Sequence, residues 1–142
     1  MKLIEPQLCV EAIVANQRNK TILIQQRSAT RKLFPLSWEF MGGHVELGET
    51  IEDCIRRELL EESGMNFVNI VAQLHEFEWE HEGQCYKDIV YLVEASGTPR
   101  LEDGKAIKLK WIRRDEIALL LRAGETTNGL YEAAMKAFDF MG

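Results

Sequence analysis

The hydrophobic and polar positions along the chain fall into short apolar runs and longer stretches with a helical period. The apolar runs are rich in β-branched residues and are separated by polar or glycine-containing segments, which is typical of strands. These runs cover residues 7–15, 20–25, 70–80, 86–95 and 106–112. The polar residues 16–19 lie between the first two runs, so we expect those two strands to form a hairpin.

Three further stretches are predicted to be helices, and the first of them is the most clearly bounded. Thr50 can cap its start, Asp53 stands three residues later, and Gly64 ends the helical pattern. The predicted helices cover residues 50–63, 114–122 and 128–138. Strands interrupted by only a few helices predict a mixed sheet packed between helices, which is an α/β or α+β layered fold.

Composition places the chain among ordinary globular domains. Its 142 residues suffice for one core, and 46% hydrophobic with 28% charged residues is an average balance. No apolar run approaches the roughly 18 residues that span a bilayer, and the N-terminal residues lack the pattern of a secretory signal. The three cysteines, Cys9, Cys54 and Cys85, suit neither a disulfide framework nor a zinc site. Reduced core thiols indicate a cytoplasmic protein.

The net charge of −6 limits the class of partner. No block of Lys or Arg stands out, so the surface is expected to repel long nucleic acids, whose binding depends on neutralising many phosphates. A small phosphorylated ligand is not excluded, because a bound divalent cation reverses the local field. The expected partners are therefore a small molecule and a metal ion, with no nucleic-acid polymer and no membrane.

The first predicted helix carries an unusual run of acidic residues on one face. Positions three or four apart share a helix face, so the stripe that begins with Ile51 and Ile55 continues with Glu58 and Glu62. Glu61 flanks them, and three like charges within about one turn repel one another. A cation held between the carboxylates would relieve this repulsion, and hard oxygen ligands suit Mg²⁺ or Mn²⁺.

A second interpretation of these acids is a solvated helix face paired with Arg56, Arg57 or nearby lysines. The preceding loop favours the metal interpretation, because Gly42, Gly43 and Gly48 allow tight turns and a close approach of backbone to a ligand. Glycines alone are a weak signal. Glycines that lead into an acid-lined helix predict a combined metal and phosphate site.

The loop and helix together resemble the Nudix box, whose pattern is glycine, five residues, glutamate, seven residues and then R-E-U-x-E-E-x-G-U, with U aliphatic. The fixed positions are filled here by Gly43, Glu49, Arg57, Glu58, Leu59, Glu61, Glu62, Gly64 and Met65. Residues 38–40 and 111–116 are also similar to family members, although Met41 stands where many members have proline. The resemblance implies one Nudix domain over residues 1–142, an α/β/α sandwich with a mixed β-sheet between helices.

The resemblance also implies roles in a Mg²⁺-dependent hydrolase, in which Mn²⁺ can substitute. The family's metal-binding acids match Glu58, Glu61 and Glu62. Glu58 serves alternatively as the general base, and the backbone carbonyl of Gly42 is an additional candidate metal ligand. Arg57 matches the arginine that orients a glutamate, and Glu49 matches the residue that supports the loop and helix. A structural salt bridge is the alternative role for these last two residues.

Some family members recruit one more acid from a loop beyond the box. Glu102, with Asp103 beside it, is the candidate metal ligand in this chain. The other acidic candidates are Glu78, Glu80 and Glu82. Because these three alternate along a predicted strand, the solvated face of that strand is their simpler interpretation.

The candidate substrate-binding residues lie in and around the loop. They are Gly43, His44, Trp38, Phe40 and Asn128. The first two can contact phosphate, whereas the two aromatic residues either line a base pocket or belong to the core. Phe34 and Trp79 are further candidates for contact with a base.

The implied chemistry is hydrolysis of the diphosphate linkage of a nucleoside diphosphate derivative. A divalent metal activates the attacking water, and a carboxylate accepts the proton. Glu80 stands where the ADP-ribose subtype tends to have proline, and His81 or Glu82 stands where the diadenosine polyphosphate subtype often has tyrosine. The expected substrate is therefore a nucleoside triphosphate (an NTP, a dNTP or oxidised dGTP), cleaved to the monophosphate and diphosphate.

The sequence leaves alternatives to this function. An ADP-ribose or nucleotide-sugar diphosphatase is the alternative substrate class. A non-catalytic nucleotide sensor need not keep all three acids, and an isomerase of the isopentenyl diphosphate type usually departs from the box. Many similar proteins dimerise, so a homodimer is a further expectation taken from the resemblance.

Overall fold

The computed structural model describes residues 5–122 and 128–142, with the side chains of residues 5–120 and 129–142. The strands are β1 (Gln7–Asn16), β2 (Thr21–Arg27), β3 (Trp38–Glu39), β4 (Met41–His44), β5 (Asn66–His81), β6 (Gln84–Ser96) and β7 (Ala106–Ile112). The helices are α1 (Ile51–Ser63), α2 (Arg114–Arg122) and α3 (Asn128–Met141).

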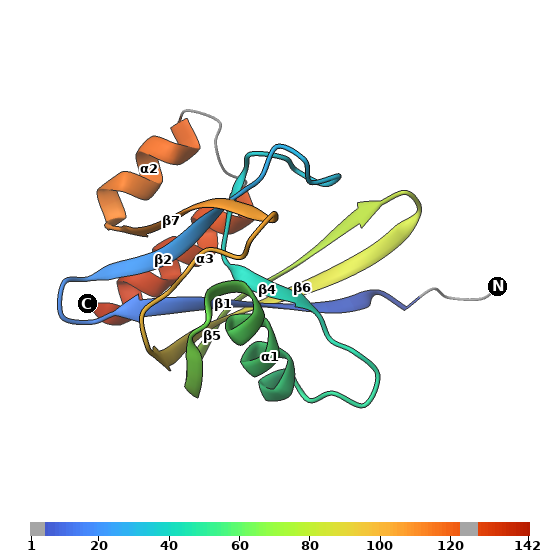
Figure 1. Cartoon of the computed structure of the whole chain (residues 1–142), viewed down its shortest axis with the longest axis horizontal. Coiled ribbons are helices and arrows are strands. Elements are labelled where there is room, and N and C mark those ends of the chain that lie inside the picture. Colours follow the sequence, from blue (N-terminus) through green and yellow to red (C-terminus); the bar gives the residue numbers. More distant parts are fainter. Residues whose placement is uncertain (1–4, 123–127) are drawn as a thin grey trace.

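The strands form one mixed sheet with β1 near its centre (Figure 1). The hydrogen-bonded order is β3-β2-β1-β6-β5, with β4 paired to β1 and β7 paired to β2. β1 runs parallel to β6, whereas the other described pairings are antiparallel. The predicted hairpin of the first two strands is confirmed, with Asn16 opposite Thr21.

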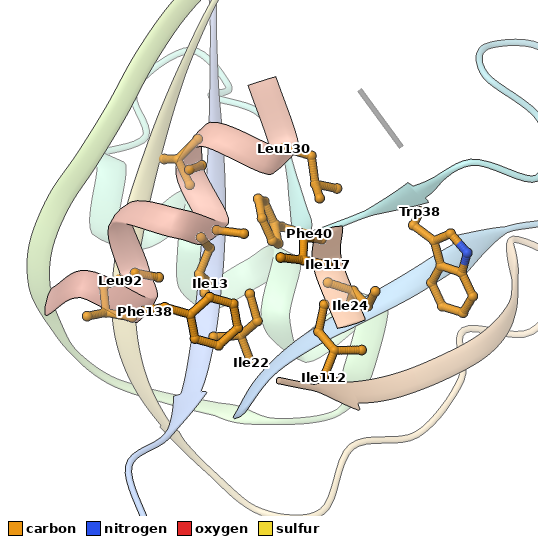
Figure 2. Packing of buried hydrophobic residues seen from close by; sticks show 14 of the residues in the cluster. Ile13, Ile22, Ile24, Trp38, Phe40, Leu92, Ile112, Ile117, Leu130 and Phe138 are labelled. Carbon is orange, nitrogen blue, oxygen red and sulfur yellow. The ribbon is translucent and has the colours of Figure 1, made fainter. Parts of the chain in front are cut away.

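Helices cover both faces of this sheet, as the strand alternation requires. Along β1, Val10 and Val14 belong to the buried cluster that includes α1, whereas Ile13 belongs to the cluster that includes α3. Figure 2 shows the cluster that includes α3, in which Phe138 packs with Ile13 and Leu92 of the sheet. The predicted α/β/α sandwich is therefore confirmed.

Local signals set the two ends of α1. The Thr50 hydroxyl accepts a hydrogen bond from the Asp53 N–H, and the Asp53 carboxylate accepts one from the Thr50 N–H, both at 3.1 Å. Gly64 ends the helix in the left-handed region, with φ of 72°. These caps fix which residues α1 contains and therefore which way its acidic side chains point.

Several elements and bounds differ from those predicted. β3 and β4 were not predicted as strands, because both are short, β4 contains two glycines, and they form only by pairing with β2 and β1. β5 begins at Asn66 rather than residue 70, and three register shifts interrupt the alternation in its first half. α3 continues past residue 138 to Met141. Among the described residues, no helix has the length and apolar character needed to cross a membrane.

Candidate functional site

Two glycines bring the strand before α1 into close contact with its neighbours. A side chain at Gly42 would overlap the backbone of β1 at the Val10 carbonyl oxygen. A side chain at Gly43 would overlap the carboxylate of Glu58 on α1. These positions therefore need glycine because the backbone lies against a neighbouring strand and an acidic side chain, not because of an unusual φ.

Arg57 links the loop to the acidic face of the helix. Its Nε donates to Glu49 Oε2 at 2.7 Å, its Nη1 donates to Glu58 Oε1 at 2.7 Å, and its Nη2 donates to the His44 carbonyl oxygen at 3.1 Å. The hydrogen bond from Arg57 lowers the pKa of Glu49 to about 2, assisted by the Glu46 N–H. Arg57 and Glu49 thus hold the loop and the Glu58 carboxylate in one arrangement.

Glu62 is a partly buried carboxylate near the end of α1, next to the backbone of the glycine loop. Its Oε2 accepts a hydrogen bond of 2.7 Å from the Gly42 N–H. Burial raises the pKa of Glu62 well above its usual value, and the charges of Glu58, Glu39 and Glu102 raise it further. The negative form of this side chain is therefore disfavoured unless positive charge is brought to it.

Glu58 and Glu61 complete the predicted acidic face but differ in environment. Burial raises the pKa of Glu58, and the charge and hydrogen bond of Arg57 oppose this rise. The Glu61 side chain is 57% exposed, and its Oε2 lies 3.6 Å from Arg57 Nη1. The helix thus presents two partly buried acids and one exposed acid.

Two acids from outside the helix face the same region. Glu102, predicted from the sequence, contributes to the raised pKa of both Glu58 and Glu62, so its carboxylate lies within electrostatic range of them. Glu39 of β3 acts on Glu62 in the same way, and the sequence reasoning did not single it out as a site residue. The Arg27 guanidinium donates to Glu39 Oε2 at 2.8 Å.

The chemistry of this donor set fits a hard divalent cation. Carboxylate oxygens are the ligands such ions prefer, and burial and neighbouring acids raise the pKa of both Glu58 and Glu62. Within the described part of the chain, no three acidic, histidine or cysteine side chains already converge as a complete cation site. The Glu58 carboxylate, now paired with Arg57, would have to turn to take part.

A pocket of about 490 Å³ leads away from these acids. Gly42, Gly43, His44 and Glu62 line one end of it. Its other lining residues include Glu11, Arg27, Phe34, Trp38, Phe40, Phe77, Trp79 and Asp88. Glu39 and Glu62 of the site therefore share one cavity with several aromatic side chains, and the cavity is of the size that holds a small-molecule ligand.

The predicted aromatic residues occupy two kinds of position in this cavity. Trp38 and Phe40 are buried in the core cluster together with Ile24 and Ile117 and show only part of their surface to the pocket (Figure 2). Trp79 stacks on Tyr86, with ring centroids 4.2 Å apart and an angle of 16° between the planes.

Other predicted substrate contacts are placed differently. The exposed ring of Phe34 meets Trp79 edge-on at 6.1 Å, at the side of the pocket. The His44 ring lies 3.3 Å from Cys9 through its Nδ1 and packs against Tyr86. The side chain of Asn128 lies outside the described residues.

Two acids in the pocket wall, Glu11, which is partly buried, and Asp88, which is buried, were not expected from the sequence. Glu11 of β1 and Asp88 of β6 lie on adjacent strands, and burial raises the pKa of each. Trp79, Cys9 and Glu11 provide polar groups near Asp88 that oppose the rise in its pKa. The only signal in the sequence was a charged residue inside each of two apolar runs.

The sequence of this chain is similar to those of known proteins of one family. A family model described as the NUDIX domain matches residues 5–133. The chain belongs to the Nudix family. An uncharacterized Nudix hydrolase of Nostoc sp. is 33% identical over 118 residues, which cover 82% of this Nudix chain and 69% of that protein. An NAD-capped RNA hydrolase of Mycobacterium tuberculosis is 29% identical over 82% of this chain but only 36% of its own length.

A solved structure supports the same assignment of fold. A MutT protein from Methanosarcina mazei superposes with a TM-score of 0.79 over 98% of this chain and 97% of that chain, at 20% identity. This similarity confirms the Nudix fold. The family match and the Nudix hydrolase from Nostoc sp. identify the protein as a Nudix hydrolase.

Proposed function

We propose that this Nudix hydrolase cleaves a nucleoside triphosphate to the nucleoside monophosphate and diphosphate, using Mg²⁺ held by the acids of α1. The observation that carries this proposal is the pocket of about 490 Å³ that joins Gly43 and Glu62 to the ring of Trp79. Phosphates fit beside the glycine loop and the acids, and a base fits beside the aromatic wall.

The proposed metal ligands are the carboxylates of Glu61 and Glu62, with Glu58 as a third ligand or as the general base. The Gly42 carbonyl and Glu102 are proposed as further ligands, and Mn²⁺ is expected to replace Mg²⁺. When bound, the cation neutralises phosphate oxygens and lowers the pKa of the attacking water. The mutual effect of these carboxylates on their pKa values supports this assignment.

The residues around Glu58 suit it to accept a proton. Its Oε1 is held by Arg57, which leaves Oε2 to take the proton of the attacking water. Burial raises the pKa of Glu58, which makes it a better base near neutral pH than an exposed carboxylate. The water oxygen attacks phosphorus, the bond to the diphosphate leaving group breaks, and the proton passes from Glu58 to solvent. Glu49 acts through Arg57 as a positioning residue.

The remaining candidate residues are proposed to bind substrate. Gly43 and His44 contact the phosphates, because both line the acidic end of the pocket. The accessible edges of Trp38 and Phe40 line the part that leads to the base.

A dinucleotide or nucleotide-sugar diphosphatase is the second candidate function. The mycobacterial relative is named as a hydrolase of NAD-capped RNA, and NAD contains a diphosphate between two nucleosides. ADP-ribose belongs to the same class of substrate. The partly open pocket has to hold a second nucleoside or sugar in this case.

The test is a panel assay of the purified protein with Mg²⁺, with Mn²⁺ and with EDTA. Nucleoside triphosphates, 8-oxo-dGTP, ADP-ribose, NAD and nucleotide sugars are offered, and chromatography identifies the products. We expect metal-dependent release of a nucleoside monophosphate and diphosphate from a triphosphate, with loss of activity in Glu62→Gln.

Glu52→Gln is the matched control, because Glu52 is an exposed acid on the same helix. It should retain the activity of the parent protein. Cleavage of ADP-ribose or NAD in preference to every triphosphate would move the assignment to the second candidate. A folded protein that releases no phosphorylated product from any compound would contradict both.

A further inference from the structure

The face of the sheet under α3 changes from apolar to acidic toward the pocket. On this face Ile13 of β1 and Val90 of β6 are buried in the core cluster. Two positions earlier on each strand, on the same face, stand Glu11 and Asp88. Both line the pocket, so the acids begin where the apolar packing under α3 ends. Stability alone would be served by apolar residues at these positions.

Asp88 is more than nine-tenths buried but incompletely hydrogen-bonded. Its residue exposure is 9%, and its Oδ1 has no hydrogen-bond partner among the described residues. The indole N–H of Trp79, which lines the same pocket, lies near enough to Asp88 to oppose the rise in its pKa, but it completes no hydrogen bond with the described residues. A buried acceptor without a donor costs free energy, and a ligand N–H that reaches it removes that cost.

The surroundings of Asp88 indicate what kind of ligand group would reach it. The Asp88 Oδ1 atom that lacks a partner favours a ligand group that donates a hydrogen bond to it. The flat rings of Trp79 and Phe34, which line the same pocket, favour a planar ligand. A nucleobase with an exocyclic amino group satisfies both conditions.

We propose that Asp88 determines base specificity by accepting a hydrogen bond from an exocyclic amino group of the nucleobase. The inference rests on the proposed function in one respect, because it takes the ligand to be a nucleotide whose phosphates lie at the Glu62 end. Trp79 contributes its ring as a wall for the base, and its N–H can donate to an acceptor on the same base.

The experiment compares ligands that differ by a single amino group. Ligand-observed NMR titrations in EDTA measure the dissociation constants of GMP and IMP, and of AMP and purine riboside 5′-monophosphate. We expect the amino-bearing member of at least one pair to bind about 10-fold more tightly, as one buried hydrogen bond implies. Absence of discrimination in both pairs overturns the inference, and this result needs no variant.

Substitutions then assign the discrimination to Asp88. Asp88→Leu removes the acceptor at similar volume and should reduce the preference to about 3-fold or less, while the nearly isosteric Asp88→Asn should give an intermediate value. Glu94→Gln makes the same acid-to-amide change at an exposed position of β6 and should leave the preference unchanged. Thermal unfolding checks that each variant is folded.

An unchanged preference in folded Asp88→Leu or Asp88→Asn overturns the inference and indicates that Asp88 and Trp79 serve only to satisfy each other. Binding without metal is independent of turnover. Discrimination in a protein that hydrolyses nothing would refute the proposed function and leave this inference standing. Hydrolysis of a nucleotide without discrimination between the paired ligands would support the proposed function and overturn this inference.

Discussion

Glu62 shows how a single residue can serve the site at the expense of the fold. It lies between the Gly42 N–H, which favours its charge, and three other carboxylates that oppose it. Since its pKa is raised in the folded protein, the folded state binds a proton more tightly than the unfolded state. The stability linked to that proton is present below the unfolded pKa of about 4.3 and is lost as the pH rises through the folded pKa.

Glu62→Gln is therefore expected to act in opposite directions on stability and activity. Without metal at pH 7.5, the uncharged amide should raise the melting temperature, because it removes a buried charge among like charges. Turnover should fall by about 100-fold or more, the effect of losing one group that stabilises the transition state. Calorimetry in EDTA and the nucleotide assay measure the two effects.

The pH supplies the control for this prediction. At pH 4 the wild-type side chain is protonated when folded, so the difference in melting temperature should shrink. A variant that melts lower than wild type at pH 7.5, or that keeps full turnover, would contradict the role given to Glu62.

Glu49 should show the opposite dependence on pH. The hydrogen bond from Arg57 lowers the pKa of Glu49 to about 2, below the unfolded value of about 4.3. Its contribution to stability is thus fully present above about pH 4.3 and is lost as the pH falls toward 2. Urea unfolding of wild type and Glu49→Gln from pH 3 to pH 7 should show the largest difference at the upper end. A difference that grows with acidity would refute the ion pair.

The short strand β4 matters to the site because it joins the sheet to the acidic helix. Residues Met41–His44 pair with β1 and then lead into the loop before α1. Its two glycines face different neighbours, one the rigid backbone of β1 and the other the movable end of Glu58. The same added methyl group should therefore have different consequences at adjacent positions.

Gly42→Ala is expected to lower the free energy of unfolding by about 1–3 kcal/mol or more, because the backbone of β1 cannot move aside. Gly43→Ala should cost much less stability, since the Glu58 side chain can shift, but it should lower kcat by displacing that carboxylate from Arg57. Urea unfolding and steady-state kinetics distinguish the two. If Gly42→Ala and Gly43→Ala lost the same stability and had the same kcat, the different roles given to the two glycines would be wrong.

The whole molecule is a sandwich, and its site is built from residues of both the sheet and helix α1. Acids from α1, β3 and the segment before β7 face one another across this arrangement. Their proximity depends on the complete fold, so a cation that binds them should stabilise all of it.

Addition of Mg²⁺ should raise the free energy of unfolding by about 2.7 kcal/mol when its concentration is 100 times the dissociation constant. The net charge of −6 also responds to screening, so KCl at equal ionic strength is the control. Glu62→Gln should lose most of the Mg²⁺ effect and keep the KCl effect. An equal response of both proteins to Mg²⁺ would show that the cation acts only as a salt.

How far the sequence predicted this structure depended on whether each signal was local. The helix of Glu58 and Glu62 was predicted from its caps and its period, both of which lie within a few residues. Glu39 was missed as a site residue because its proximity to Glu62 arises only when β3 joins β2. Asp88 was missed for a similar reason, since Cys9 and Asp88 become neighbours only through the pairing of β1 with β6.

That parallel pairing of β1 with β6 also has a kinetic consequence. Gln7 lies beside Tyr86, whereas β5 and β6 are joined by a turn of two residues, so the second pairing closes a far smaller loop. Contacts that close large loops form slowly, because chain entropy is lost before the contacts repay it. We expect the β5–β6 hairpin and α1 to form early and β1 to dock late. The acids of α1 would then be in place on their helix before β1 contributes its residues to the pocket. The docking of β1, as the last event of folding, would also complete the binding site.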